Sequence, residues 1–139
     1  MTTTNEPTRA GTAEVLVDHL GSDSYSGTGR REFLQYRDIG LAAATGQRFR
    51  ALGMWASGEN EATGWHYHVC DVQLVYVLQG WVELEFEGGR IVRVKAGESI
   101  YIPGGLKHNE IATSDDFQIL EVSVPAEMGT QACEPPAKR

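Results

Sequence analysis

The chain has little of what several protein classes require. Only two of its 139 residues are cysteine, and Cys70 and Cys133 lack the spacing of a disulfide framework, so we assign no disulfide. No apolar run approaches the ~20 residues that a membrane-spanning helix needs. Lys and Arg number 12 against 19 Asp and Glu, and the net charge of −7 argues against nucleic acid as a partner. Residues 1–7 show no secretory signal pattern, so the cytoplasm is the expected location.

Helical periodicity and the common catalytic sets are also missing. The sequence shows no Ser-His-Asp or Cys-His nucleophile set and no glycine loop of the kind that cradles phosphate. It contains instead 16 glycines, which divide it into short segments. Residues 81–87 have a period of two, with Val82, Leu84 and Phe86 on one face and three glutamates on the other, which is typical of a strand with one face in water. Gly88 and Gly89 then signal a hairpin.

Such segments recur between residues 33 and 124 and indicate roughly eight or nine short strands, the pattern of a sandwich or barrel. Residues 74–78 are apolar at every position, which predicts a central strand covered on both faces. We therefore expect one all-β domain over residues 31–125, a small closed barrel. A flexible arm over residues 1–30 should precede it and a mobile tail over residues 126–139 should follow; within the arm, residues 14–20 suit a short strand or a segment lying on a partner.

Three histidines are the candidate metal ligands. His66 and His68 lie two residues apart in a segment of strand character, so both imidazoles point to one face of that strand. His108 follows the turn formed by Pro103, Gly104 and Gly105 and supplies a third imidazole. Three converging neutral imidazoles suit a divalent transition metal, whereas the fourth histidine, His19, lies outside these segments and reads as an exposed loop residue.

These two segments resemble the two sequence motifs of the cupin superfamily, in particular the small single-domain bacterial cupins. The residues that match the first motif are His66, His68 and Gly80, and those that match the second are Gly97, Pro103, Gly105 and His108. The resemblance covers about residues 48–124 and implies a double-stranded β-helix, also called a jelly-roll barrel, with the metal in its lumen. It also implies a homodimer, for which residues 15–20 and the tryptophans at 55, 65 and 81 could supply contacts.

The chain departs from the family pattern at three positions. Asn60 and Ala112 replace a glycine and an asparagine, and Gln73 stands where the family carries a carboxylate ligand. Gln73 can ligate through its amide oxygen but brings no charge, so the metal would keep its full double charge and favour an anionic, bidentate substrate. Two alternatives stay open, which are Asp71 as the fourth ligand and a site with no fourth protein ligand.

The resemblance implies a metal-dependent oxygenase of the dioxygenase type, acting on a small enol, dicarbonyl or phenolic substrate. Iron(II) suits an imidazole-rich site with open positions, and zinc, nickel and manganese are alternatives. A lyase, isomerase or cyclase that does not use O₂ is a second hypothesis, and a non-catalytic barrel that binds a metal or small ligand is a third. No catalytic side chain is assigned, and no organic cofactor is expected.

Three further charged residues have two readings each. Glu110 lies two residues after His108 and either shares its face, as a general base or a partner of an imidazole, or faces solvent at a strand end. Arg48 and Arg50 either reach the lumen and bind a substrate carboxylate or lie on the surface. Cys70 reads as a small buried residue rather than a nucleophile.

Overall fold

The structure is a computed structural model that describes residues 11–21, 34–56 and 62–137. One short helix and ten strands lie in these ranges. They are β1 (Leu34–Asp38), α1 (Leu41–Ala44), β2 (Arg50–Ala56), β3 (His66–Val69), β4 (Val72–Gln79), β5 (Trp81–Phe86), β6 (Ile91–Lys95), β7 (Ser99–Tyr101), β8 (His108–Thr113), β9 (Gln118–Val124) and β10 (Gly129–Ala132). Within the described ranges, no helix has the length and apolar character to span a bilayer.

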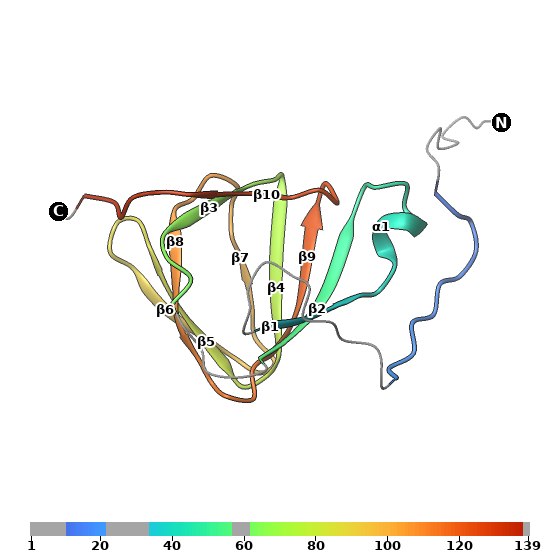
Figure 1. The fold of residues 1–139 in the computed structure, drawn as a ribbon, viewed down its shortest axis with the longest axis horizontal. Helices are drawn as coiled ribbons and strands as arrows, with labels where there is room; N and C mark the ends of the chain where they lie inside the picture. The colour runs from blue at the N-terminus through green and yellow to red at the C-terminus, as the bar shows by residue number, and fades with distance from the viewer. Residues whose placement is uncertain (1–10, 22–33, 57–61, 138–139) are drawn as a thin grey trace.

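The strands form two five-stranded antiparallel sheets that face each other (Figure 1). The first sheet has the order β1-β2-β9-β4-β7 and the second has the order β10-β3-β8-β5-β6. Consecutive strands often lie in different sheets, as β3 and β4 do, so the chain repeatedly crosses between the two layers. This is the expected all-β jelly-roll barrel.

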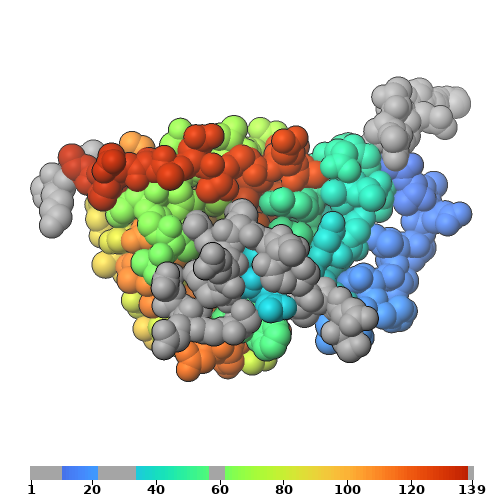
Figure 2. All heavy atoms as spheres, in the orientation of Figure 1, coloured from blue at the N-terminus to red at the C-terminus, as the bar shows by residue number. Residues whose placement is uncertain are grey.

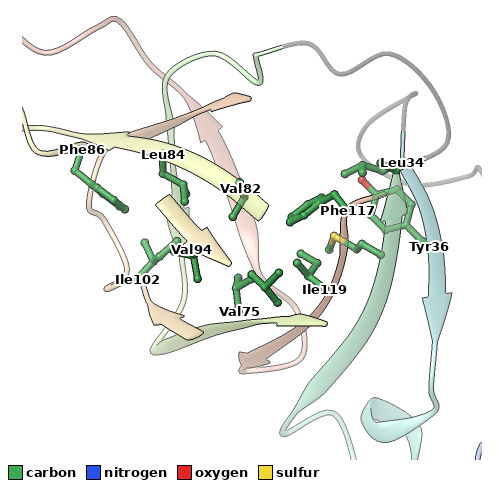
Figure 3. Close-up of a cluster of buried hydrophobic side chains, with 13 residues drawn as sticks. Leu34, Tyr36, Val75, Val82, Leu84, Phe86, Val94, Ile102, Phe117 and Ile119 are labelled. Atoms are coloured by element: carbon green, nitrogen blue, oxygen red, sulfur yellow. The ribbon is translucent and has the colours of Figure 1, made fainter. Parts of the chain in front are cut away.

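The apolar core lies between the two sheets (Figure 3). In β5, Val82, Leu84 and Phe86 point inward, and in β4, Val75 and Val77 point inward to meet them. The inward positions are two residues apart because every second side chain of a strand falls on the same face. The polar residues of β5 fall on the outer face, as the sequence pattern predicts.

The outer face of β4 differs from the expectation. The prediction that both faces of residues 74–78 are covered is wrong for this chain on its own, because Leu74, Tyr76 and Leu78 are 38, 42 and 52% exposed. The inner face carries the core residues Val75 and Val77, so only that half of the apolar run is explained by burial. The outer half forms an exposed apolar strip along β4, which lies between β9 and the edge strand β7 of the first sheet.

The two ends of the chain also differ from the sequence reading. Residues 11–21 contain no strand and run along one side of the molecule (Figure 2). Thr12 N–H donates to Ala44 O over 2.9 Å, and Arg37 pairs with Asp18. Residues 129–132, which the sequence reading placed in a mobile tail, form β10 and pair with β3. Their composition gave no strand signal, because pairing with β3 rather than local propensity forms this strand. The domain boundaries themselves stay a prediction.

Candidate metal centre

The three predicted histidines come together inside the barrel. His66 and His68 lie on β3, and His108 lies directly opposite His66 in the register of β8 with β3. Their candidate ligand atoms all lie within 4.8 Å of one another. The side chains are buried, with exposures of 4, 4 and 1%. Three buried imidazoles around one point form a donor set that suits a divalent transition metal.

Hydrogen bonds fix the way two of the rings face. His66 Nδ1 lies 2.8 Å from Gly64 O, and His108 Nδ1 lies 2.9 Å from Leu106 O. A carbonyl oxygen only accepts, so Nδ1 carries the proton in both rings and a neutral ring keeps its lone pair on Nε2. This arrangement prepares Nε2 for a metal, since ligating histidines generally donate their other N–H to such a partner.

His68 is held differently, because its Nδ1 contacts the hydroxyl Oγ1 of Thr130 over 3.0 Å. Thr130 lies on β10 and is paired with His68 in the register of β10 with β3. A hydroxyl can accept the Nδ1 proton, and in that tautomer His68 matches the other two rings. The sequence reading missed Thr130, since no spacing or pattern links it to His68.

The turn before His108 fastens the second motif to the first. Gly105 N–H donates to His68 O over 2.9 Å. A methyl group added at Gly104 would lie 2.2 Å from Cys70 O, so only glycine lets the turn approach this closely. The two motifs therefore share a backbone contact, which requires glycine at position 104, and the positive φ of 82° favours glycine at position 105.

Gln73 lies on β4, across the lumen from the sheet that carries the imidazoles. It is 3% exposed, and its Nε2 donates to Glu121 Oε2 over 3.1 Å. Its Oε1 is buried and has no hydrogen-bond partner. A buried amide oxygen without a partner is costly, so this atom fits a position that a metal or a bound ligand would satisfy.

One cavity of about 30 Å³ opens between the two sheets. Its lining comprises Leu34, Tyr36, Met54, Thr63, His66, His68, Gln73, Glu110, Ala112, Thr113, Phe117, Ile119 and Glu121. A single water occupies at least ~10–15 Å³ on this measure, so the cavity has room for an ion and a few ligand atoms. Apolar side chains, among them Met54, Phe117 and Ile119, form part of the remaining wall, and the carboxylates of Glu110 and Glu121 also line it.

The other charged residues considered from the sequence lie at different distances from the cavity. Asp71 is exposed and does not line the cavity, so nothing here brings it to the three imidazoles. Glu110 does line the cavity, and its backbone is tied to Thr63 by N–H to Oγ1 over 3.1 Å. Arg50 reaches the interior at Glu121, whereas Arg48 donates to Thr45 O and lies over the ring of Phe49.

Glu121 is the main residue that sequence reasoning missed. It is 4% exposed, lines the cavity and lies between Gln73 and Arg50, whose Nη2 is 3.7 Å from its Oε1. The alternation of β9 contains the signal, because Ile119, Glu121 and Ser123 fall on one face and all are buried. A glutamate in phase with core residues should have been read as an interior carboxylate.

Cys70 has the environment of an unreactive thiol. Burial raises its pKa above the ordinary value, and the carboxylates of Asp71 and Glu121 raise it further. A raised pKa keeps the sulfur protonated, and the thiolate is the nucleophilic form. The structure thus supports the reading of Cys70 as a small packing residue.

Comparisons with known proteins agree with this architecture. The family model described as "Cupin domain" matches residues 53–123. The polyketide cyclase RemF from Streptomyces resistomycificus is similar in structure, with 21% identity, 84% of each chain covered and a TM-score of 0.66. KdgF from Halomonas sp. is 20% identical over 74% of this chain and 88% of its own, with a TM-score of 0.60. EutQ from Clostridium difficile is 21% identical over 68% of this chain and 69% of its own, with a TM-score of 0.55.

These structural likenesses establish the fold alone, because all of the identities are low. A search for similar curated proteins found no match. Any activity must therefore be argued from the site itself.

Proposed function

The chain belongs to the cupin domain family, and from that premise we propose that it is a metal-dependent enzyme acting on a small molecule that binds as an enolate or phenolate. The observation that carries the proposal is the group of three buried imidazoles, whose ligand atoms lie within 4.8 Å of one another. We include Gln73 as the fourth ligand because its buried Oε1 has no hydrogen-bond partner. All four donors are neutral, which favours an anionic substrate.

Two groups of residues have different roles in the proposed enzyme, one binding the metal and the other excluding water. His66, His68, His108 and Gln73 hold the ion, which when bound would supply Lewis acidity and, as iron(II), reactivity toward O₂. Apolar side chains of the cavity wall, among them Met54, Phe117 and Ile119, exclude water from the substrate. The small cavity favours a compact substrate over an extended polyphenol.

The first proposed reaction is an oxygenation of a 1,3-dicarbonyl or related enol. It is tested by measuring O₂ uptake and substrate loss together in iron(II)-loaded protein. We expect both to proceed in step, and both to stop in the His108→Ala variant. The same substrate loss without O₂ would contradict an oxygenase.

The second candidate is a lyase, isomerase or cyclase that does not use O₂, and Glu110 is the observation that favours it. Glu110 lines the same cavity as His66 and His68, and a carboxylate there could take a proton from the carbon next to a carbonyl. Anaerobic exchange of that carbon-bound proton with deuterium, followed by NMR, is the expected signature. Loss of the exchange in Glu110→Gln, with metal content unchanged, would support this route.

Elemental analysis of protein purified without chelator tests the metal itself. We expect iron, with zinc, nickel or manganese as the alternatives, at one ion per chain. If metal-free protein binds small ligands as well as loaded protein does, the chain is a binding barrel and both enzymatic proposals fail.

We also propose that the protein is a homodimer formed through the outer face of β4. Leu74, Tyr76 and Leu78 form an exposed apolar strip there, and a second copy presents the same strip. Analytical ultracentrifugation at micromolar concentration should give the mass of a dimer, and Leu78→Glu should give a monomer. The matched control is Ile91→Glu, since Ile91 is 62% exposed on the other sheet. A wild-type monomer would overturn the proposal.

A further inference from the structure

The carboxylate of Glu121 lies inside the barrel between two partners. Its Oε2 accepts a hydrogen bond from Gln73 Nε2 over 3.1 Å, and its Oε1 lies 3.7 Å from Arg50 Nη2. The backbone explains this grouping. Arg50 and Gln73 both lie opposite Ser123 of β9, one from β2 and one from β4, and Glu121 is the next inward residue of β9. Three adjacent strands therefore place a cation, an amide and a carboxylate together.

This contact determines which end of the Gln73 amide faces which way. An amide has a donor end and an acceptor end, whereas an ionised carboxylate only accepts. Glu121 therefore takes Nε2, and Oε1 must point to the other side. Oε1 is buried without a partner, and Gln73 lines the cavity together with His66 and His68.

The same contact explains why an amide occupies position 73. A glutamate there would bring a second carboxylate to about the same separation from Glu121, with like charges side by side in a buried place. The negative charge that the family places at position 73 lies here one strand away, on Glu121, with Arg50 beside it.

We propose that Glu121 is a positioning residue that holds Gln73 with its amide oxygen toward the metal and that makes an amide, rather than a carboxylate, the residue that fits at position 73. This rests on the proposed function in one respect, which is that Gln73 is a ligand. It assigns to Glu121 no contact with the ion.

The test is binding of Co(II) to metal-free protein, followed by its visible absorption, which reports both affinity and ligand geometry. Glu121→Gln should weaken Co(II) binding about 10–100-fold, the usual effect of losing a partner that orients a ligand. Its spectrum should shift, because the amide of Gln73 can then turn over. Glu121→Asp keeps the charge but shortens the side chain, and it should weaken binding as well.

A double-mutant cycle separates positioning from direct attraction between Glu121 and the ion. In the Gln73→Ala background, Glu121→Gln should change Co(II) affinity less than about 2-fold, since there is no amide left to orient. An effect as large as in the wild-type background would overturn the proposal, and so would full affinity and an unshifted spectrum in Glu121→Asp.

Stability of the metal-free protein tests the explanation for the amide. Gln73→Glu should lower the melting temperature, and adding Glu121→Gln should recover most of the loss, since the new amide at 121 can donate to the new carboxylate at 73. No recovery in the double variant would contradict this part.

Ser123→Ala is the matched control. Ser123 is completely buried on the same face of β9, and its Oγ has no hydrogen-bond partner, so we expect an unchanged Co(II) spectrum.

These experiments distinguish failure of the role proposed for Glu121 from failure of the proposed function. If wild-type protein does not bind Co(II), the proposal of a metal site is wrong. If Gln73→Ala binds Co(II) as tightly as wild type, Gln73 is not a ligand. If Gln73 is a ligand but the double-mutant cycle shows no coupling, only the positioning role of Glu121 is wrong.

Discussion

The two sheets hold their metal-binding candidates in different ways. In the sheet that contains β3 and β8, His66 and His108 are each fixed by a backbone carbonyl two residues earlier in the chain. In the sheet that contains β4 and β9, Gln73 is fixed by the side chain of Glu121, 48 residues away. The orientation of His66 and of His108 depends only on the segment of chain that contains each residue, whereas the orientation of Gln73 depends on Glu121, on another strand. His68 lies between these cases, since its partner Thr130 belongs to β10.

Removing a locally fixed imidazole should have the largest effect. His108→Ala should weaken metal binding by more than about 100-fold, because loss of a ligand exceeds the 10–100-fold effect of losing a ligand's partner. Co(II) titration of metal-free protein measures it, with His19→Ala as the control, since His19 is exposed. Comparable binding by the two variants would mean that the three histidines do not form the site.

The second-largest effect is expected from Gly104→Ala, which should displace the end of β3, the strand that carries His66 and His68. In Gly104→Ala the new methyl group meets Cys70 O, so the backbone must shift, at a cost of about 1–3 kcal/mol in the free energy of unfolding. Urea denaturation of metal-free protein measures this. Gly129→Ala is the control, because its methyl group would lie 3.4 Å from Val69 Cβ, an ordinary contact. Equal stability of both variants would show that the turn can relax away from β3.

The side-chain partner of His68 should matter less than a ligand. Thr130→Val removes the hydroxyl and keeps the shape, and we expect Co(II) affinity to fall about 10-fold. Thr130→Ser keeps the hydroxyl and should retain the affinity. If Thr130→Val binds Co(II) as tightly as wild type, then β3 orients His68 without help from β10. Gln73 would then be the one proposed ligand whose orientation depends on a distant side chain.

The smallest effect concerns Cys70, in the link from β3 to β4 where the chain passes from one sheet to the other. Its raised pKa means that a smaller fraction of the thiol is ionised at pH 8 in the folded protein than in the unfolded chain. Alkylation by iodoacetamide in a Cys133→Ser variant should therefore be slower without urea than with it, and should accelerate as the pH rises. Faster alkylation of the folded protein would contradict the assigned environment.

Strand alternation and turn glycines were enough to predict the barrel and its inward faces. The His66-x-His68 spacing works as a signal because residues two apart on one strand share a face. Pro103, Gly104 and Gly105 predicted a turn, whereas the close approach of Gly104 to Cys70 O became visible only in the structure. The exposed outer face of β4 could not be predicted, since an apolar run reads the same whether its second face is covered or not. Thr130 could not be predicted, because it reaches His68 only through the pairing of β10 with β3, which the local sequence does not encode. Glu121 could have been predicted to be buried from the alternation of β9, but its contact with Gln73 depends on the pairing of β9 with β4.

The long connection between His68 and Thr130, 62 residues apart, also bears on the order in which the protein folds. Contacts between distant residues form only after long loops close, so folding dominated by them is slow and the site is completed late. In the unfolded chain, His66, His68, Cys70 and Asp71 are close in sequence, but His108 and Gln73 are not held beside the two imidazoles, so the full donor set exists only in the finished barrel. Metal binding should therefore report the finished barrel, and added Co(II) should slow unfolding far more than it speeds refolding.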